Sequence, residues 1–220
     1  MLDAVPAYEP QQLHDVAASA QLHAGLGQPN LSHIGREELR DFAAELERAL
    51  KPSGRVLIWD IGDGASAEVI ERSCEQLSVP FPSEYVDFLR DVDGFTVDVY
   101  SASHVGKEYM PLYTFEVAGA RRTVNLTRVL RRSLRYIATG APAPSLEYID
   151  TLIAVSASSL DSVVFSWEQL GSDSPRNIVV IDVEYMFEDG FSTCVSPSLD
   201  EHIARSLTAM ISGDGNPVYW

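Results

Sequence analysis

One stretch of this 220-residue sequence concentrates positive charge, because residues 117 to 146 hold six arginines and no carboxylate. Four of them have the spacing i, i+3, i+4 and i+7, which places them on one face of a helix: Arg128, Arg131, Arg132 and Arg135. The simplest interpretation is a solvated helix face whose arginines pair with carboxylates of the same chain. A protein interface rich in arginine is the main alternative, and a nucleic-acid or membrane surface is a weaker one.

The rest of the chain is strongly acidic. With 32 Asp and Glu against 16 Lys and Arg, the formal net charge is −16, so the chain without those six arginines carries −22. A field of this sign repels nucleic acid and anionic membranes and favours a basic protein partner, although an acidic surface also serves solubility alone. Five carboxylates expected at loops and turns are our candidate protein-binding residues: Asp91, Asp93, Asp98, Glu188 and Asp189.

No catalytic or metal-binding motif stands out. The histidines are scattered, at positions 14, 23, 33, 104 and 202, and none lies near a cysteine in the spacing of metal ligands. The turn Gly62-Asp63-Gly64 lies where an anion-binding loop would lie, but Asp63 would repel phosphate. We therefore predict no enzyme activity, no cofactor and no metal site. The alternative is a dispersed active site, marked by a carboxylate beside His104 or His202.

Two helices with a proline-rich break should organise the fold, in the stretch ERSCEQLSVPFPSEYVDFLRDVDGF (71–95). Pro80 and Pro82 end the first helix, because proline fixes φ and lacks an N–H. Ser83 is expected to N-cap the second helix, and Gly94 to stop it in a left-handed conformation. The apolar face of this second helix is given by helical spacing: Tyr85, Phe88, Leu89 and Val92.

These residues resemble the opening of the SUKH superfamily (the Smi/Knr type), in which a glutamate-bearing helix precedes L-P-x-x-Y-x-x-F-L and then N-G. The parallel residues are Glu71, Glu75, Leu77, Phe81, Pro82, Tyr85, Phe88, Leu89, Asp93 and Gly94. Phe81 stands where the family often has leucine, and Asp93 where it often has asparagine, which tolerates the same turn geometry. The resemblance covers about residues 56 to 212.

The resemblance implies a non-enzymatic immunity protein that binds and neutralises a co-encoded polymorphic toxin, often a nuclease. We therefore predict that a basic toxin domain is the partner and that an acidic surface steers and binds it. The family's toxin-binding surface varies, so no contact residue is carried over. The alternatives are a regulatory scaffold that acts through protein contacts and a small-ligand-binding domain of the same fold.

The patterns divide the chain into four parts: a loosely ordered arm (1–34), a helix–strand elaboration (35–64), the SUKH-like domain (65–212) and a tail (213–220). Helices are predicted at 36–50, 125–138 and after Ser198, which opens a capping box with Glu201. The apolar set of the middle helix is Leu126, Val129, Leu130, Leu134 and Ile137. Strands are predicted at 55–61, 95–100, 110–117, 152–157, 163–168, 178–187 and 191–195.

This order predicts an α+β fold, with an antiparallel (mixed) sheet flanked by helices. No apolar run approaches the 18 residues of a membrane span, and the N-terminus lacks the features of a signal peptide. We therefore expect a cytoplasmic protein that binds neither membrane nor nucleic acid.

Overall fold

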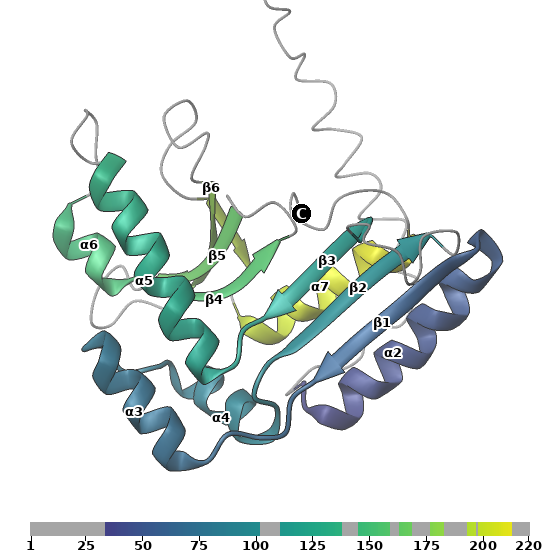
Figure 1. The fold of residues 1–220 in the computed structure, drawn as a ribbon, viewed down its shortest axis with the longest axis horizontal. Coiled ribbons are helices and arrows are strands. Elements are labelled where there is room, and N and C mark those ends of the chain that lie inside the picture. The colour runs from purple at the N-terminus through teal and green to yellow at the C-terminus, as the bar shows by residue number, and fades with distance from the viewer. Residues whose placement is uncertain are drawn as a thin grey trace, which may run out of the picture. The chain divides into compact units, whose positions relative to one another are not determined.

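In the part of the chain that the structure describes, seven strands pair in the order in which they follow one another along the sequence, and every pair is antiparallel. The computed structural model describes residues 34–101, 111–137, 145–158, 163–168, 177–182, 193–196 and 198–212. The strands are β1 (Arg55–Ile61), β2 (Phe95–Ser101), β3 (Tyr113–Val117), β4 (Ile153–Ser158), β5 (Val163–Glu168), β6 (Asn177–Asp182) and β7 (Thr193–Ser196). The helices are α2 (Arg36–Leu50), the 3-10 turn η2 (Lys51–Ser53), α3 (Ala67–Leu77), α4 (Ser83–Asp91), α5 (Ala120–Ile137), α6 (Leu146–Thr151) and α7 (Leu199–Ser212). The predicted α+β class, an antiparallel sheet flanked by helices, is confirmed (Figure 1).

Strands β1 to β3 have one buried face and one open face. In β2, Phe95, Val97 and Val99 are buried and alternate with half-buried residues, as the predicted period of two requires. Helix α7 packs against the buried face and lies behind β2 and β3 in Figure 1. There the His202 ring meets the Phe115 ring edge to face, with centroids 5.5 Å apart. The opposite face carries the alternate residues of these strands, among them Thr96, Asp98 and Glu116.

Helix α4 joins this core through a row of aromatic rings. Their centroids lie 5.3 to 6.3 Å apart along the series Phe81, Tyr85, Phe88, Phe95 and Phe115. The fully buried Tyr85 hydroxyl hydrogen-bonds the Ala118 carbonyl and the Thr123 hydroxyl. It thereby ties α4 to the connection between β3 and α5. Burial raises the pKa of Tyr85 far above its ordinary value, so the hydroxyl stays a proton donor.

Three connections meet at Gly62, Gly94 and Gly119, and none of these positions has room for a side chain. A Cβ atom on any of them would lie 2.4 to 2.6 Å from backbone of a neighbouring connection. The Gly62 N–H donates to the Gly94 carbonyl at 2.9 Å, which joins the ends of β1 and β2. Gly94 also has a φ of +85°, a conformation that a side chain disfavours.

The boundaries of α4 differ from those predicted. Pro82, not Ser83, is the N-cap residue, and the helix ends at Asp91 with an extended Val92 as its C-cap. Val92 is fully buried, and its extended backbone is where the helix stops. Gly94 is left-handed as expected, but it lies beyond the C-cap and serves the junction of the three connections.

Two further elements depend on contacts that local periodicity does not show. Helix α5 begins at Ala120, five residues before the prediction, because the Asp93 carboxylate accepts the Ala120 N–H at 2.6 Å. Helix α6 was not predicted and is only six residues long. Its N-cap is Ser145, whose hydroxyl accepts the Tyr148 N–H. At the last helix the predicted cap is confirmed, since the Ser198 hydroxyl accepts the Glu201 N–H at 3.1 Å.

The predicted helix–strand elaboration is part of the main sheet. Strand β1 forms its first edge, in register with β2 from Arg55 to Ile61, and α2 packs on β1. The described residues fall within one compact unit. The boundary at residue 64, which rests on the family resemblance, stays a prediction.

Candidate functional site

The open face of β1 to β3 carries carboxylates in two neighbouring rows. The strand register aligns Asp60 with Thr96 and Glu116 in one row, and Ile58 with Asp98 and Thr114 in the next. We call these six residues the acidic sheet face. Asp60 is exposed, and Ile58 keeps 47% of its surface exposed. With strands about 4.8 Å apart, the Asp60 and Glu116 positions are separated by about 10 Å, with Thr96 between them and Asp98 two residues farther along β2.

A shallow groove of about 270 Å³ runs along one end of this face. The charged residues that line it are Asp60, Asp93 and Glu116, together with Arg121 and Arg122 from the first turn of α5. Arg122 Nε lies 3.0 Å from Glu116 Oε1, so one carboxylate of the face is already paired. Asp60 has no hydrogen-bond or ion-pair partner in the part of the chain that the structure describes.

Of the five candidate acidic residues, one lies on this face. Asp98 is half-buried there and accepts the Thr114 hydroxyl at 2.6 Å. Asp91 instead accepts the Arg36 N–H at 2.7 Å, and Asp93 the Ala120 N–H, so they satisfy the first amides of α2 and α5. Glu188 and Asp189 lie outside the described residues.

Sequence reasoning missed Asp60 and Glu116. Both lie within strands, whereas the candidate carboxylates were chosen at positions expected to be loops or turns. The signal that places them is the alternation of β1 and β3, because every second residue of a strand faces the open side.

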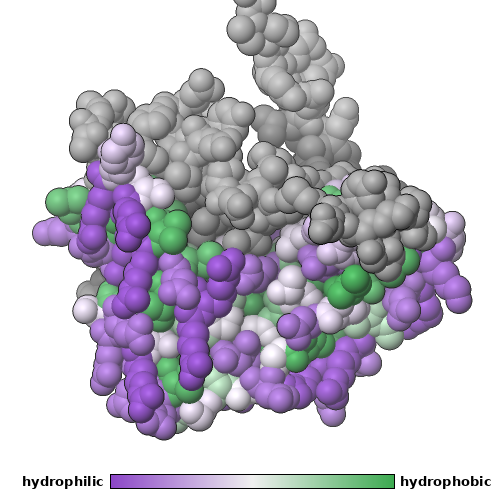
Figure 2. Space-filling view, in the orientation of Figure 1, coloured by the Kyte–Doolittle hydropathy of each residue, from purple (hydrophilic) through white to green (hydrophobic). Residues whose placement is uncertain are grey.

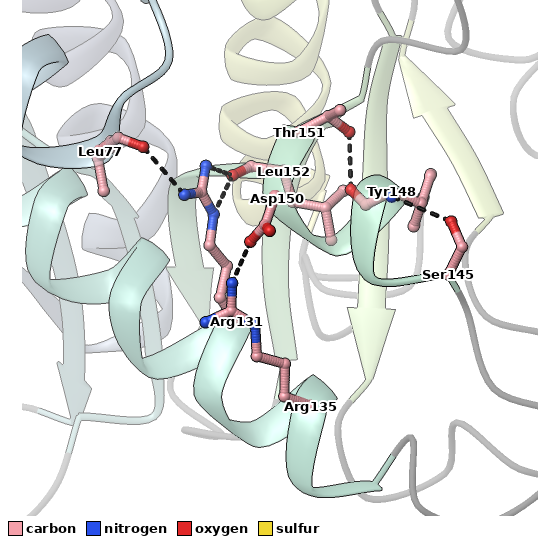
Figure 3. Close-up of polar contacts among 8 residues, drawn as sticks. All are labelled: Leu77, Arg131, Arg135, Ser145, Tyr148, Asp150, Thr151 and Leu152. Atoms are coloured by element: carbon pink, nitrogen blue, oxygen red, sulfur yellow. Dashed lines mark hydrogen bonds and ion pairs between the residues drawn. The ribbon is translucent and has the colours of Figure 1, made fainter.

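The arginine face of α5 is not a uniformly solvated surface. Arg131 is buried, with 9% of its surface exposed. Its Nε and Nη2 donate to the Leu152 carbonyl at 3.2 and 2.9 Å, and its Nη1 donates to the Leu77 carbonyl at 3.2 Å (Figure 3). Leu77 ends α3 and Leu152 is the C-cap of α6, so one guanidinium satisfies carbonyls at two helix C-termini. Burial lowers the pKa of Arg131 from its ordinary value.

The other three arginines have different surroundings. Arg135 forms an ion pair with Asp150 of α6, the pairing that the simplest interpretation predicted (Figure 3). Arg128 donates to the backbone and side-chain oxygens of Gln76, at 3.4 and 3.3 Å. Arg132 is exposed, and the described residues offer it no hydrogen bond or ion pair. These four arginines, with Gln76 and Leu77, line a pocket of about 360 Å³, which we call the arginine pocket.

The predicted apolar set of α5 was partly wrong. Leu130 and Leu134 are buried, but Val129 is 62% exposed. Thr123 and Thr127 are fully buried in the helix, and Thr127 Oγ1 accepts the Ala154 N–H from β4 at 2.9 Å. Threonine takes core positions here because each hydroxyl has a partner in the core.

His202 is buried on α7 and has a lowered pKa, about 3 against an ordinary 6.5. Desolvation is the main cause, and the charge of Arg205 adds to it. No carboxylate is among the causes of this shift, whereas a dispersed active site was expected to show a carboxylate beside the histidine. His202 also lines neither the groove nor the arginine pocket. His104 lies outside the described residues.

Comparison of the chain with models of known protein families gave no match, and comparison with curated proteins gave none either. None of the described helices has the length and apolar character of a membrane span. Among the described histidines, cysteines and carboxylates, no three come together as ligands for a metal ion.

Proposed function

We propose that this chain is a non-enzymatic binding protein that captures a basic protein partner on its acidic sheet face. The observation that carries the proposal is the open face of β1 to β3, on which Asp60, Asp98 and Glu116 gather beside the exposed Ile58. Carboxylates around an apolar contact suit a basic partner, because charge complementarity speeds encounter while apolar contact slows release.

The residues that resemble the SUKH superfamily support a more specific form of this proposal. In that form the partner is a co-encoded toxin domain, often a nuclease, whose basic substrate groove the acidic face blocks, and the chain acts as an immunity protein in the cytoplasm. Carboxylates about 10 Å apart across the sheet can meet several basic groups of such a groove at once.

The test is capture of the toxin domain encoded beside this protein, measured at low and high salt, with growth of toxin-expressing cells as the second readout. We expect one-to-one binding that salt weakens, because the attraction is screened beyond about 8 Å at physiological ionic strength. If no neighbouring toxin binds and the cells still die, the immunity proposal fails.

Two charge variants then locate the contact. Asp60→Lys reverses a charge on the acidic sheet face without breaking a described contact, and Glu47→Lys makes the same change on the exposed side of α2. We expect the first to lower the association rate about tenfold and the second to leave it nearly unchanged. Equal rates for both variants would show that the partner binds elsewhere.

A further inference from the structure

The arginine pocket contains more positive charges than the described carboxylates neutralise. It lies beside the C-terminal end of α3, and four guanidinium groups from two turns of α5 line it. Asp150 neutralises Arg135, and the remaining contacts of these arginines are with uncharged carbonyl and amide oxygens. Like charges at this spacing on a helix repel one another. About three positive charges of the arginine pocket therefore have no carboxylate partner, although the whole chain has a net charge of −16.

The buried member of the pocket is held in a fixed orientation. Three of the five N–H groups of Arg131 donate to the Leu77 and Leu152 carbonyls, which come from two different elements. The other two N–H groups have no partner among the described residues. A guanidinium held in this way has already lost its rotational freedom, so a ligand that binds it does not have to order it.

Arg132 is the one arginine of this pocket for which the described residues show no structural role. Arg128 and Arg131 satisfy carbonyls near helix ends, and Arg135 pairs with a carboxylate, but Arg132 contacts none of the described polar groups. Arg132 is exposed to solvent, and Figure 2 shows hydrophilic side chains over the region of α5. The exposed Arg132 lines the same pocket as three arginines whose side chains are held by hydrogen bonds or an ion pair.

We propose that the arginine pocket binds a small phosphate-bearing ligand, either inorganic phosphate or a phosphate monoester. The planar fork of arginine matches two oxygens of a phosphate group, and a phosphate can engage more than one fork at once. A pocket of about 360 Å³ has the size of a small-ligand site. The acidic remainder of the chain does not prevent this, because its repulsion is screened beyond about 8 Å at physiological ionic strength.

Isothermal titration calorimetry with sodium phosphate and with adenosine monophosphate, at constant ionic strength, tests the proposal on the full chain. The variants are Arg132→Ala and, as a matched control, Arg40→Ala on the exposed side of α2. Both arginines are exposed, and circular dichroism verifies that each variant folds.

We expect wild type and Arg40→Ala to bind with similar affinity, and Arg132→Ala to bind at least tenfold more weakly. Tighter binding of the monophosphate would identify a monoester as the ligand, and equal binding would identify phosphate itself. The proposal is overturned if neither probe binds wild type, or if Arg132→Ala binds as well as wild type does.

Discussion

Replacing Arg131 by methionine should destabilise the protein strongly, although the residue carries a charge that burial disfavours. Methionine keeps the apolar part of the side chain but removes every donor to the Leu77 and Leu152 carbonyls. A buried acceptor without a partner costs about 1–3 kcal/mol, so two of them cost about 2–6 kcal/mol. The methionine variant also lacks the desolvation penalty of a buried charge, which offsets part of this destabilisation. We expect a net loss of about 3 kcal/mol in the free energy of unfolding.

Urea unfolding followed by circular dichroism measures this loss, with two variants for comparison. Arg131→Lys keeps the charge but lacks the planar fork that reaches both carbonyls, so its loss should lie between those of wild type and Arg131→Met. Arg132→Met changes an exposed neighbour on the same helix and should stay within about 0.5 kcal/mol of wild type. If Arg131→Met unfolds at the wild-type urea concentration, the guanidinium does not hold the ends of α3 and α6, and the reasoning is refuted.

Three other changes test the core and its junctions. The pKa of His202 is lowered from 6.5 to about 3, so only the unfolded chain takes up its proton between these pH values. The free energy of unfolding should therefore fall as the pH drops from 6.5 toward 3, by up to roughly 5 kcal/mol, and urea titrations should show a smaller fall for His202→Met. Tyr85→Phe leaves the Ala118 carbonyl and Thr123 without their partner and should cost about 1–3 kcal/mol in the same assay, whereas a neutral result would contradict the buried hydrogen bonds. Gly94→Ala combines a positive φ with a clash at 2.4 Å and should lower the melting temperature in calorimetry, and a variant as stable as wild type would disprove the close packing there.

Much of the fold could be predicted because its elements follow local periodicity. Strand β1 and helix α2 lie where the apolar patterns placed them, and β2 alternates as expected. The errors occur where a distant residue decides the outcome. The start of α5 depends on Asp93, which is 27 positions away, and no local pattern contains that contact.

The candidate site was harder to predict for the same reason. The spacing of the four arginines correctly gathers them on one face, but spacing says nothing of the two helix ends that bury Arg131. Three candidate carboxylates lie in the described part of the chain, and two of them cap helices. A count of charges therefore overstates the acidic surface that a partner can meet.

Several charged side chains in this protein hydrogen-bond the terminal N–H or C=O groups of helices. We regard this role as structural and distinguish it from charge that is available to a partner. Carboxylates of Asp91, Asp93 and Glu84 accept the opening amides of α2, α5 and α7, which is the favourable sign at a helix N-terminus. Arg131 provides the opposite sign at the ends of α3 and α6. Asp60 on the sheet and Arg132 on α5, the two charged residues on which our proposals rest, have no such role among the described residues. Arg122, which contacts the acidic sheet face, precedes Arg132 by ten residues, or about 15 Å of helix. That distance exceeds the screening length of about 8 Å at physiological salt, so the negative charge of the acidic sheet face and the positive charge of the arginine pocket need not cancel each other.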